Sequence, residues 1–266
     1  MLRSAVACDP RRQLIGSAIR EGDPDVDTPK ESYPQLISLA VHEFRTPASV
    51  VGGYLRMLQK DTDALSDRQR KMIDEAEKSC ARLVAIVSEL SDVGKLDAGI
   101  IKLARQPIDA FTLVAEVAAL VHEARDREVR LEVRGANSGA TMSGDATRLR
   151  NAFDAIFRAI LREKPGQCTV VAERRIEEID GRRTALLIVA EEDSVQAAYD
   201  RQAGPFYEKR GGMGLSLPLA RRVIEGHGGR LLAPAPLDEP EPGFEPRDPV
   251  WRGSAIISFP LTESAR

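Results

Sequence analysis

Cysteine is scarce in this chain of 266 residues. Its three cysteines, Cys8, Cys80 and Cys168, are odd in number and far apart in the sequence. This spacing fits neither a disulfide framework nor a metal site, and it suits a reducing cytosol. Because Cys80 falls on the apolar face of an expected helix, its expected role is packing in a core.

Long apolar runs and basic clusters are missing as well. No stretch of about 18 apolar residues occurs, and the N-terminus lacks the apolar core of a signal peptide, so we expect a cytoplasmic protein without a membrane span. Lysine and arginine number 38 against 41 aspartates and glutamates, and no basic cluster is interleaved with aromatics. Nucleic acid is therefore not an expected partner. The length suffices for one sizeable globular domain and a smaller helical element.

The first part of the chain predicts a flexible segment followed by two long helices. Residues 1–31 include a polar stretch rich in proline and aspartate, without a recognisable sensor module. Residues 32–60 predict a helix, because apolar residues recur at spacings of four and three, which defines a coiled-coil-like seam. The residues of this seam are Ile37, Val41, Phe44, Ala48, Val51, Leu55 and Leu58.

A second helix is expected to begin after Ser66, which forms a capping box with Gln69, and to end near residues 93–95. Its seam consists of Ile73, Ala76, Cys80, Leu83, Val87 and Leu90. Residues 32–97 therefore predict an antiparallel helical hairpin. A single hairpin cannot bury both seams well, so we expect two copies to form a dimeric four-helix bundle. The alternative is a hairpin that packs on its own C-terminal domain.

The run His-Glu-Phe-Arg-Thr-Pro at residues 42–47 lies inside the first seam. His42 flanks the seam, and Thr46 shares its face one turn later. The neighbouring carboxylate of Glu43 can take the proton from one imidazole nitrogen and leave the other free to attack an electrophile. Pro47 removes a backbone donor and is expected to kink the helix. A lone histidine on a helix flank is usually a solvated surface residue, but this grouping favours a nucleophile.

Residues 36–60 resemble the phosphoacceptor helix of two-component sensor histidine kinases, whose motif runs His-Glu-Leu/Phe-Arg-Thr-Pro. The resemblance implies that His42 accepts a phosphoryl group and that Glu43 is its general base. It implies that Thr46 positions a water for removing phosphate from a partner aspartate. It also implies a homodimer and, as a further partner, the receiver domain of a response regulator.

Residues 105–266 predict an α/β sandwich, so that the whole chain belongs to the α+β class. Asp180-Gly181 predicts a hairpin turn between two of the strands. The expected helices span 111–126, 146–163 and 216–226, on one face of a mixed sheet with strands near 129–134, 141–143, 168–176, 184–190, 230–233 and 253–260. This order is similar to the ATP-binding domain of histidine kinases, type II topoisomerases and Hsp90 chaperones, and it implies ATP and Mg²⁺ as cofactors.

Two nucleotide motifs of that domain have counterparts in this chain. The runs around Phe206 and from Gly211 to Leu217 resemble the phenylalanine box and the second glycine box. Gly212 and Gly214 would let backbone N–H groups approach phosphates at the start of a helix, whose dipole favours anions. The alternative is a flexible turn before an amphipathic helix. His227, at the end of that helix, and His122 are interpreted as structural.

The metal-binding motif is altered. Asp145 to Leu149 resemble the opening of the asparagine box, but its two asparagine positions fall on Ala155 and Ala159. Alanine offers no oxygen to Mg²⁺, so we expect no metal site here. Losing the metal would cost about 4 kcal/mol of transition-state stabilisation, roughly a thousandfold in rate.

The first glycine box, Asp-x-Gly-x-Gly in the family, reads Glu191-Glu192-Asp193-Ser194-Val195. Glu191 could still accept a hydrogen bond from the amino group of adenine. Asp193 and Val195 put side chains where glycine lets the backbone approach a nucleotide. The sequence therefore predicts weak nucleotide binding.

Three functions remain open after this reading. The first is a cytosolic kinase that autophosphorylates His42 with an atypical nucleotide geometry. The second is a phosphoryl carrier and phosphatase, which exchanges phosphate between His42 and response-regulator aspartates. The third is a dimeric pseudokinase that docks a regulator or another kinase and moves no phosphate. The intact motif at His42 beside the missing metal ligand favours the second function.

Overall fold

The computed structural model describes residues 32–60, 65–209, 212–236 and 249–261, without the side chains of residues 32–36. The predicted flexible segment 1–31 lies outside these residues. The chain divides into two compact units, one built around the helical hairpin and the other around the sheet. Within the described ranges, every helix is too short or too polar to span a lipid bilayer.

The hairpin consists of α2 (Ser32–Lys60) and α3 (Asp67–Asp97). Ser66 and Gln69 form the predicted capping box: the N–H of Gln69 donates to Ser66 Oγ at 3.4 Å, and the N–H of Ser66 donates to Gln69 Oε1 at 2.9 Å. This cap satisfies backbone donors that the first turn of α3 leaves free. Both predicted helices are thus confirmed, and α3 continues slightly beyond the expected end.

Only part of the predicted seam is covered within one hairpin. Val41 of α2 and Cys80 and Val87 of α3 are buried. Five more residues of the seam are half-buried and the others are exposed, because an apolar stripe with both heptad positions filled is wider than one partner can cover. The exposed large residues are Phe44, Val51 and Leu58 on α2, with Leu83 of the predicted seam and Met72 on α3.

The second unit contains a six-stranded sheet with the order β2-β4-β5-β8-β7-β6 and a two-stranded ribbon of β1 and β3. The pair β2 and β4 is parallel, and the other pairs are antiparallel. The strands are β1 (Gln106–Asp109), β2 (Val129–Gly135), β3 (Thr141–Gly144), β4 (Cys168–Ile179), β5 (Arg182–Glu191), β6 (Ala203–Pro205), β7 (Arg230–Pro234) and β8 (Ala255–Pro260).

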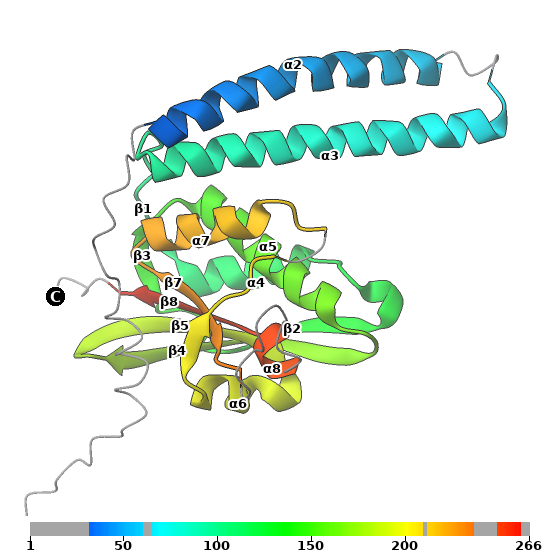
Figure 1. Cartoon of the computed structure of the whole chain (residues 1–266). Coiled ribbons are helices and arrows are strands. Elements are labelled where there is room, and N and C mark those ends of the chain that lie inside the picture. Colours follow the sequence, from blue (N-terminus) through cyan, green and yellow to red (C-terminus); the bar gives the residue numbers. More distant parts are fainter. Residues whose placement is uncertain (1–31, 61–64, 210–211, 237–248, 262–266) are drawn as a thin grey trace, which may run out of the picture. The chain divides into compact units, whose positions relative to one another are not determined.

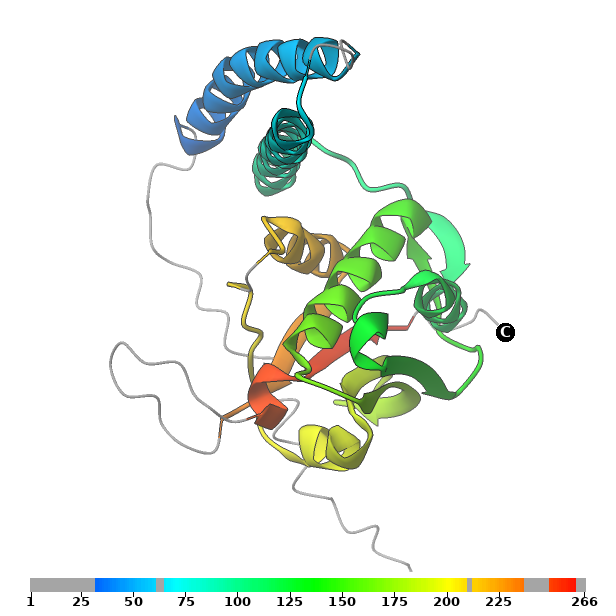
Figure 2. The same ribbon diagram turned by 90° about the vertical axis from the view of Figure 1, so that its right-hand side faces the viewer.

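Helices lie on both faces of this sheet. Figures 1 and 2 show α4 (Ala110–Leu120), α5 (Ala146–Glu163) and α7 (Ser216–Gly226) on one face, and the short α6 (Val195–Asp200) and α8 (Pro249–Arg252) on the other. The prediction of helices on one face alone is therefore incomplete. Short helices carry little periodic signal, and these two are held by packing on the sheet.

The expected helix 111–126 is wrong beyond residue 120. Val121 is extended, and Ala124 and Glu128 adopt left-handed backbone conformations with φ of 58°. The segment has helix-forming residues, but Val121 and Ala124 are buried, so tertiary packing overrides propensity here. His122 consequently lies after α4, on the surface, rather than in a helix.

The hairpin turn between β4 and β5 is confirmed. Asp180 and Gly181 have φ of 51° and 73°, the positive values that a two-residue hairpin turn requires. The register places Ile179 opposite Arg182. Both β4 and β5 are inner strands of the sheet, and Val170, Ala172, Ile188 and Val189 on them are almost fully buried.

Arg174 on β4 is a buried cation in this unit. Its guanidinium donates to the backbone oxygens of Arg134 and Phe111 at 3.2 and 3.1 Å, and to Oδ1 of Asn137 at 2.9 Å. Burial lowers the pKa of Arg174 from its ordinary value. The side chain joins β4 to the start of α4 and to the segment after β2.

Candidate functional site

His42 stands on the surface of α2 with 79% of its side chain exposed. Its Nδ1 lies 3.6 Å from Oε1 of Glu43, which is 72% exposed. This distance is longer than a hydrogen bond but allows the carboxylate to receive a proton from Nδ1 after a small rotation. Thr46 Oγ1 donates to the backbone oxygen of His42 at 3.5 Å. The structure thus brings the three predicted residues together and leaves Nε2 without a contact to Glu43.

Pro47 lies inside α2, one turn beyond Glu43. The helix continues through it, and Figure 1 shows α2 curved along its length beside the straighter α3. A proline inside a helix removes the hydrogen bond to the carbonyl four residues earlier, which here belongs to Glu43. The predicted phosphoacceptor motif therefore ends where α2 lacks one backbone hydrogen bond and is less rigid.

A second apolar stripe shares the face of His42. Leu39, Val50 and Met57 are 59%, 52% and 64% exposed. Together with His42 and Thr46 they follow spacings of three, four and seven residues, so they lie on one side of the helix. The spacing is present in the sequence, but only the seam on the neighbouring face, which contains more apolar residues, was identified from it.

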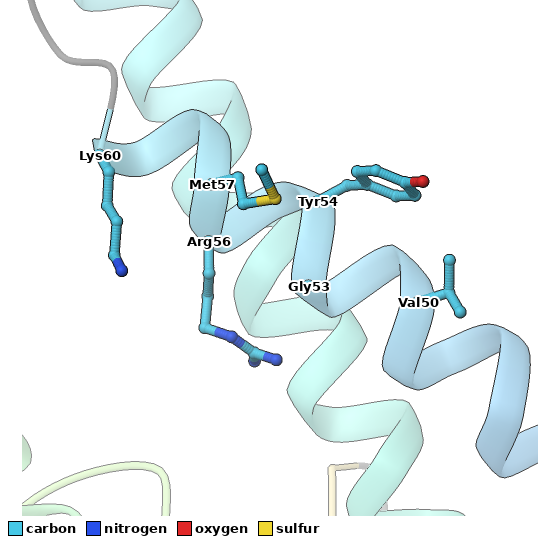
Figure 3. Close-up of a pocket in the computed structure, with 6 residues that line it drawn as sticks. All are labelled: Val50, Gly53, Tyr54, Arg56, Met57 and Lys60. Carbon is cyan, nitrogen blue, oxygen red and sulfur yellow. The ribbon is translucent and has the colours of Figure 1, made fainter.

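The second stripe contains a shallow open hollow with a volume of about 510 Å³. Figure 3 shows the side chains of Val50, Tyr54 and Met57 beside it, while Gly53 contributes none. Arg56 and Lys60 bring positive charge to its border. The hollow can accept an apolar side chain of a protein partner, with an acidic group nearby.

Glu191, the predicted adenine acceptor, lies at the end of β5. Its Oε2 is 3.3 Å from Nζ of Lys164, which follows the end of α5. Lys164 is only 7% exposed, whereas Glu191 is 45% exposed. The lysine was not identified from the sequence, because a basic residue at a helix end is ordinarily read as a partner of the helix dipole.

The two asparagine positions of α5 are part of the core. Ala155 and Ala159 are 6% and 1% exposed. Within the described parts of the chain, no group of three or more His, Cys, Asp and Glu side chains could hold a metal ion. The residues present therefore do not fit Mg²⁺ at this position, because they offer it no oxygen ligands.

The segment that resembles the first glycine box is helical. Residues Glu192–Ser194 form a 3₁₀ turn, and Val195 begins α6. Val195 and Tyr199 pack against a buried cluster of Ile188, Ala190 and Ala198. The side chain of Val195, which was expected to obstruct a nucleotide, thus helps to hold α6 on the sheet, and the effect on a nucleotide stays a prediction.

An ion-pair network covers the outer side of α5. Oε1 of Glu123 lies 2.7 Å from Nε of Arg162, and its Oε2 lies 3.2 Å from Nη1 of Arg158. The hydrogen bond from Arg162 lowers the pKa of Glu123 and outweighs the opposing effect of burial. Arg162 also donates to the backbone oxygen of Gly212 at 3.2 Å.

Two glycines of the predicted glycine loop have positive φ angles. Gly212 and Gly214 have φ of 84° and 60°, values that favour glycine. A Cβ added to Gly212 would lie 3.0 Å from Nη1 of Arg162. The backbone oxygen of Gly212 is thus bound by the guanidinium of Arg162, a cation of the same chain. Phe206 is buried, with 3% exposure, and its backbone oxygen accepts a hydrogen bond from Arg221 at 3.0 Å, so its ring belongs to the core.

His227 is held as a neutral buried residue. Its Nε2 accepts a hydrogen bond from the backbone N–H of Asp145 at 2.9 Å, and its Nδ1 donates to the backbone oxygen of Val223 at 2.6 Å. Burial lowers the pKa of His227. Both ring nitrogens are engaged, which agrees with the structural role predicted for this histidine.

Comparison with known proteins places these features in a family. Residues 35–99 match the His Kinase A (phospho-acceptor) domain. The sensor protein DivL of Caulobacter vibrioides is 28% identical over 212 residues, which cover 76% of this chain and 26% of DivL. The sensor protein GacS of Pseudomonas syringae pv. syringae is 27% identical over 205 residues, which cover 71% of this chain and 22% of GacS. The chain thus spans about a quarter of these relatives.

The signal transduction histidine-protein kinase BarA of Escherichia coli K12 is 28% identical over 202 residues, covering 71% of this chain and 22% of BarA. The fold is similar to the crystal structure of full-length ShkA in complex with AMPPNP, with a TM-score of 0.61 and 21% identity over 88% of this chain and 47% of ShkA. The matched domain and these relatives support the two-component sensor histidine kinase family, with a phosphoacceptor helical hairpin followed by an α/β sheet domain.

Proposed function

We propose that this protein carries a phosphoryl group on His42 and exchanges it with the aspartate of a response-regulator receiver domain. The observation that carries the proposal is a contrast between the two units. His42 is 79% exposed beside Glu43, whereas the metal-ligand positions Ala155 and Ala159 are buried. ATP-driven autophosphorylation is not part of the proposal.

The geometry at His42 supports a direct transfer. Nε2 attacks the phosphorus of an aspartyl phosphate, so that a P–N bond forms and the bond between phosphorus and the aspartate oxygen breaks. The aspartate leaves as a carboxylate. The imidazole becomes cationic in this step, and its Nδ1 proton passes to Glu43, whose Oε1 lies 3.6 Å away. The reverse sequence returns the phosphoryl group to the receiver domain.

Thr46 is the residue that we assign to dephosphorylation. Its hydroxyl lies one turn from His42 on the same exposed face, and its bond to the His42 carbonyl is at the limit of hydrogen-bonding distance. The hydroxyl can therefore turn outward and hold a water against an aspartyl phosphate. This role predicts that Thr46→Ala slows phosphate release and spares transfer to His42.

Two exposed apolar surfaces of α2 support two protein partners. Leu39, Val50 and Met57 adjoin His42 and support docking of the receiver domain beside the reacting nitrogen. Phe44 and Leu58 belong to the other face, which together with apolar residues of α3 supports a homodimer. Exposed apolar residues grouped this way mark interaction surfaces.

The decisive experiment compares the wild-type chain with His42→Ala in two reactions. One reaction supplies γ-labelled ATP with Mg²⁺, and the other supplies receiver domains labelled on their aspartate. Acid-labile label that depends on His42 and comes only from the receiver domains is the expected result. Label from ATP on the wild type alone would establish a working kinase and contradict the expectation that the altered nucleotide motifs do not support autophosphorylation.

A second candidate function is a dimeric scaffold that binds a regulator or partner kinase and moves no phosphate. The exposed apolar faces of α2 favour it independently of any chemistry. Binding of a receiver domain that persists unchanged in His42→Ala, without label in either reaction, would select the scaffold over the carrier.

A further inference from the structure

Two unusually close approaches between α2 and α3 lie on opposite sides of Pro47. On the N-terminal side, a Cβ added to Gly94 would lie 3.1 Å from Cγ2 of Ile37. On the C-terminal side, a Cβ added to Gly52 would lie 3.3 Å from Sγ of Cys80. Both distances are shorter than ordinary contacts of a methyl group, so glycine sets the spacing of the helices at these two points.

The second approach is reinforced by a hydrogen bond. The thiol of Cys80 donates to the backbone oxygen of Ala48 at 3.1 Å. Cys80 and Gly52 are both buried, whereas Thr46 and Pro47 are exposed. The turn of α2 that directly follows Pro47 is therefore held against α3 by the contact with Cys80.

Pro47 separates the two anchored parts of the helix. It cannot donate the backbone hydrogen bond to the carbonyl of Glu43, so the two parts of α2 are coupled less rigidly than in an unbroken helix. His42 and Thr46 lie between the two anchors. The direction in which the helical turn of His42 and Thr46 faces then depends on how closely each part of α2 approaches α3.

We infer that Gly52 and Gly94 are positioning residues that set the direction in which α2 presents His42 to a phosphorylated partner. The inference rests on the proposed function. A methyl group at Gly94 meets Ile37, which is β-branched and has little rotamer freedom in a helix, so the first part of α2 moves away. A methyl group at Gly52 displaces Sγ of Cys80 and breaks its bond to Ala48.

Gly53 offers a matched control for these substitutions. It is the next residue of the same helix, and a Cβ added there meets nothing within 4 Å. Gly53→Ala gives the same gain in helix propensity as Gly52→Ala without pressing on α3. Gly53 also borders the hollow that is assigned to receiver docking, so this variant serves as a control for the structure of α2, and the wild type is the reference for phosphoryl transfer.

The test measures two reactions of His42 in the full chain. A receiver domain phosphorylated by acetyl phosphate reports on presentation to a protein, and phosphoramidate, a small phosphoryl donor, reports on the imidazole itself. We expect Gly52→Ala and Gly94→Ala to slow transfer from the receiver about tenfold relative to the wild type, and phosphoramidate labelling to change less than about twofold, because misplacement penalises only the oriented reaction.

The double variant Gly52→Ala with Cys80→Ala provides the rescue. Removing Sγ makes room for the new methyl group, so transfer from the receiver is expected to recover toward the rate of Cys80→Ala alone. Equal transfer rates in Gly52→Ala and the wild type, or equal losses in both reactions, would overturn the inference.

If the proposed function itself is wrong, the outcome differs from a failure of the positioning role. If no receiver domain exchanges phosphate with the wild type, amide NMR spectra decide the positioning role by themselves. Shifts of residues 39–46, beyond Pro47, in Gly52→Ala but not in Gly53→Ala would support it. Unchanged signals of these residues in both variants would refute it.

Discussion

The ammonium group of Lys164 lies 3.3 Å from a carboxylate oxygen of Glu191, and the two side chains differ strongly in exposure, 7% against 45%. The carboxylate at the end of β5 is therefore already paired with a cation of the same chain. Lys164 is held in place through its backbone, because Arg127 donates to its carbonyl oxygen at 2.8 Å. A nucleotide base that sought this carboxylate would have to compete with the lysine.

The difference in exposure predicts an asymmetry between two substitutions. Glu191→Gln leaves the buried charge of Lys164 without its carboxylate, and we expect it to lower the free energy of unfolding by about 1–3 kcal/mol. Lys164→Met keeps an apolar chain of similar length and leaves Glu191 solvated, so a change below about 1 kcal/mol is expected. Urea unfolding of both variants checks the order, and a larger loss in Lys164→Met would contradict it.

Restoring the asparagine at the metal position is expected to fail. Ala159 is 1% exposed, so Ala159→Asn buries an amide among apolar side chains without partners. We expect a loss of about 1–3 kcal/mol in unfolding free energy and no gain in Mg-ATP affinity. Calorimetric titration with Mg-ATP, beside denaturant unfolding, measures both. Tight Mg-ATP binding by either the variant or the wild type would contradict our reading of this position.

His42 can be replaced without structural damage. Its side chain is 79% exposed, and surface substitutions of this kind usually change stability by less than about 0.5 kcal/mol. His42→Ala should therefore keep the thermal midpoint and the oligomeric state while losing all acid-labile label. Circular dichroism and light scattering are the measurements, and unfolding or dissociation of this variant would place His42 in the packing of the hairpin.

The apolar face of the hairpin predicts the oligomeric state. Leu83 is 58% exposed on α3. Leu83→Glu is expected to convert the proposed dimer into a monomer, because it puts a charge on the apolar face that we assign to the interface, whereas Ser88→Glu adds the same charge at another exposed position. Light scattering over a concentration series distinguishes the two variants. A dimer that tolerates Leu83→Glu would exclude this face as the interface.

The buried histidine predicts a pH dependence of stability. Burial lowers the pKa of His227 below its ordinary value of 6.5, so the unfolded chain binds a proton more readily than the folded one. Stability from this group is present above pH 6.5 and falls as the pH drops from 6.5 toward the lowered pKa. We expect His227→Gln to be less stable at neutral pH but to lose less stability over this interval, measured by denaturant unfolding at a series of pH values.

The elements that could be predicted best from the sequence are those determined by residues close together in the chain. The capping box of Ser66, the turn at Asp180 and the helix that follows Asp145 depend on residues close together in the chain. The grouping of His42 with Glu43 could be predicted for the same reason, since both lie on one helix.

Features that depend on distant residues could not be predicted. Lys164 and Glu191 are 27 positions apart, and their pairing follows from how α5 ends beside β5. Likewise, Arg162 contacts a glycine carbonyl 50 positions away. The same holds for α6, which is only six residues long and is held on the sheet by a buried cluster. Local propensity contains no information on such contacts.

Arg174 gives the sheet unit a property of its own. Its guanidinium takes all three of its described partners from outside β4: the first turn of α4, the last part of β2 and the side chain of Asn137. Opening any one of these segments leaves donors of a buried cation unpaired, which is costly. The three segments are therefore expected to exchange their amide hydrogens at one common rate, as a single cooperative block, instead of fraying one by one.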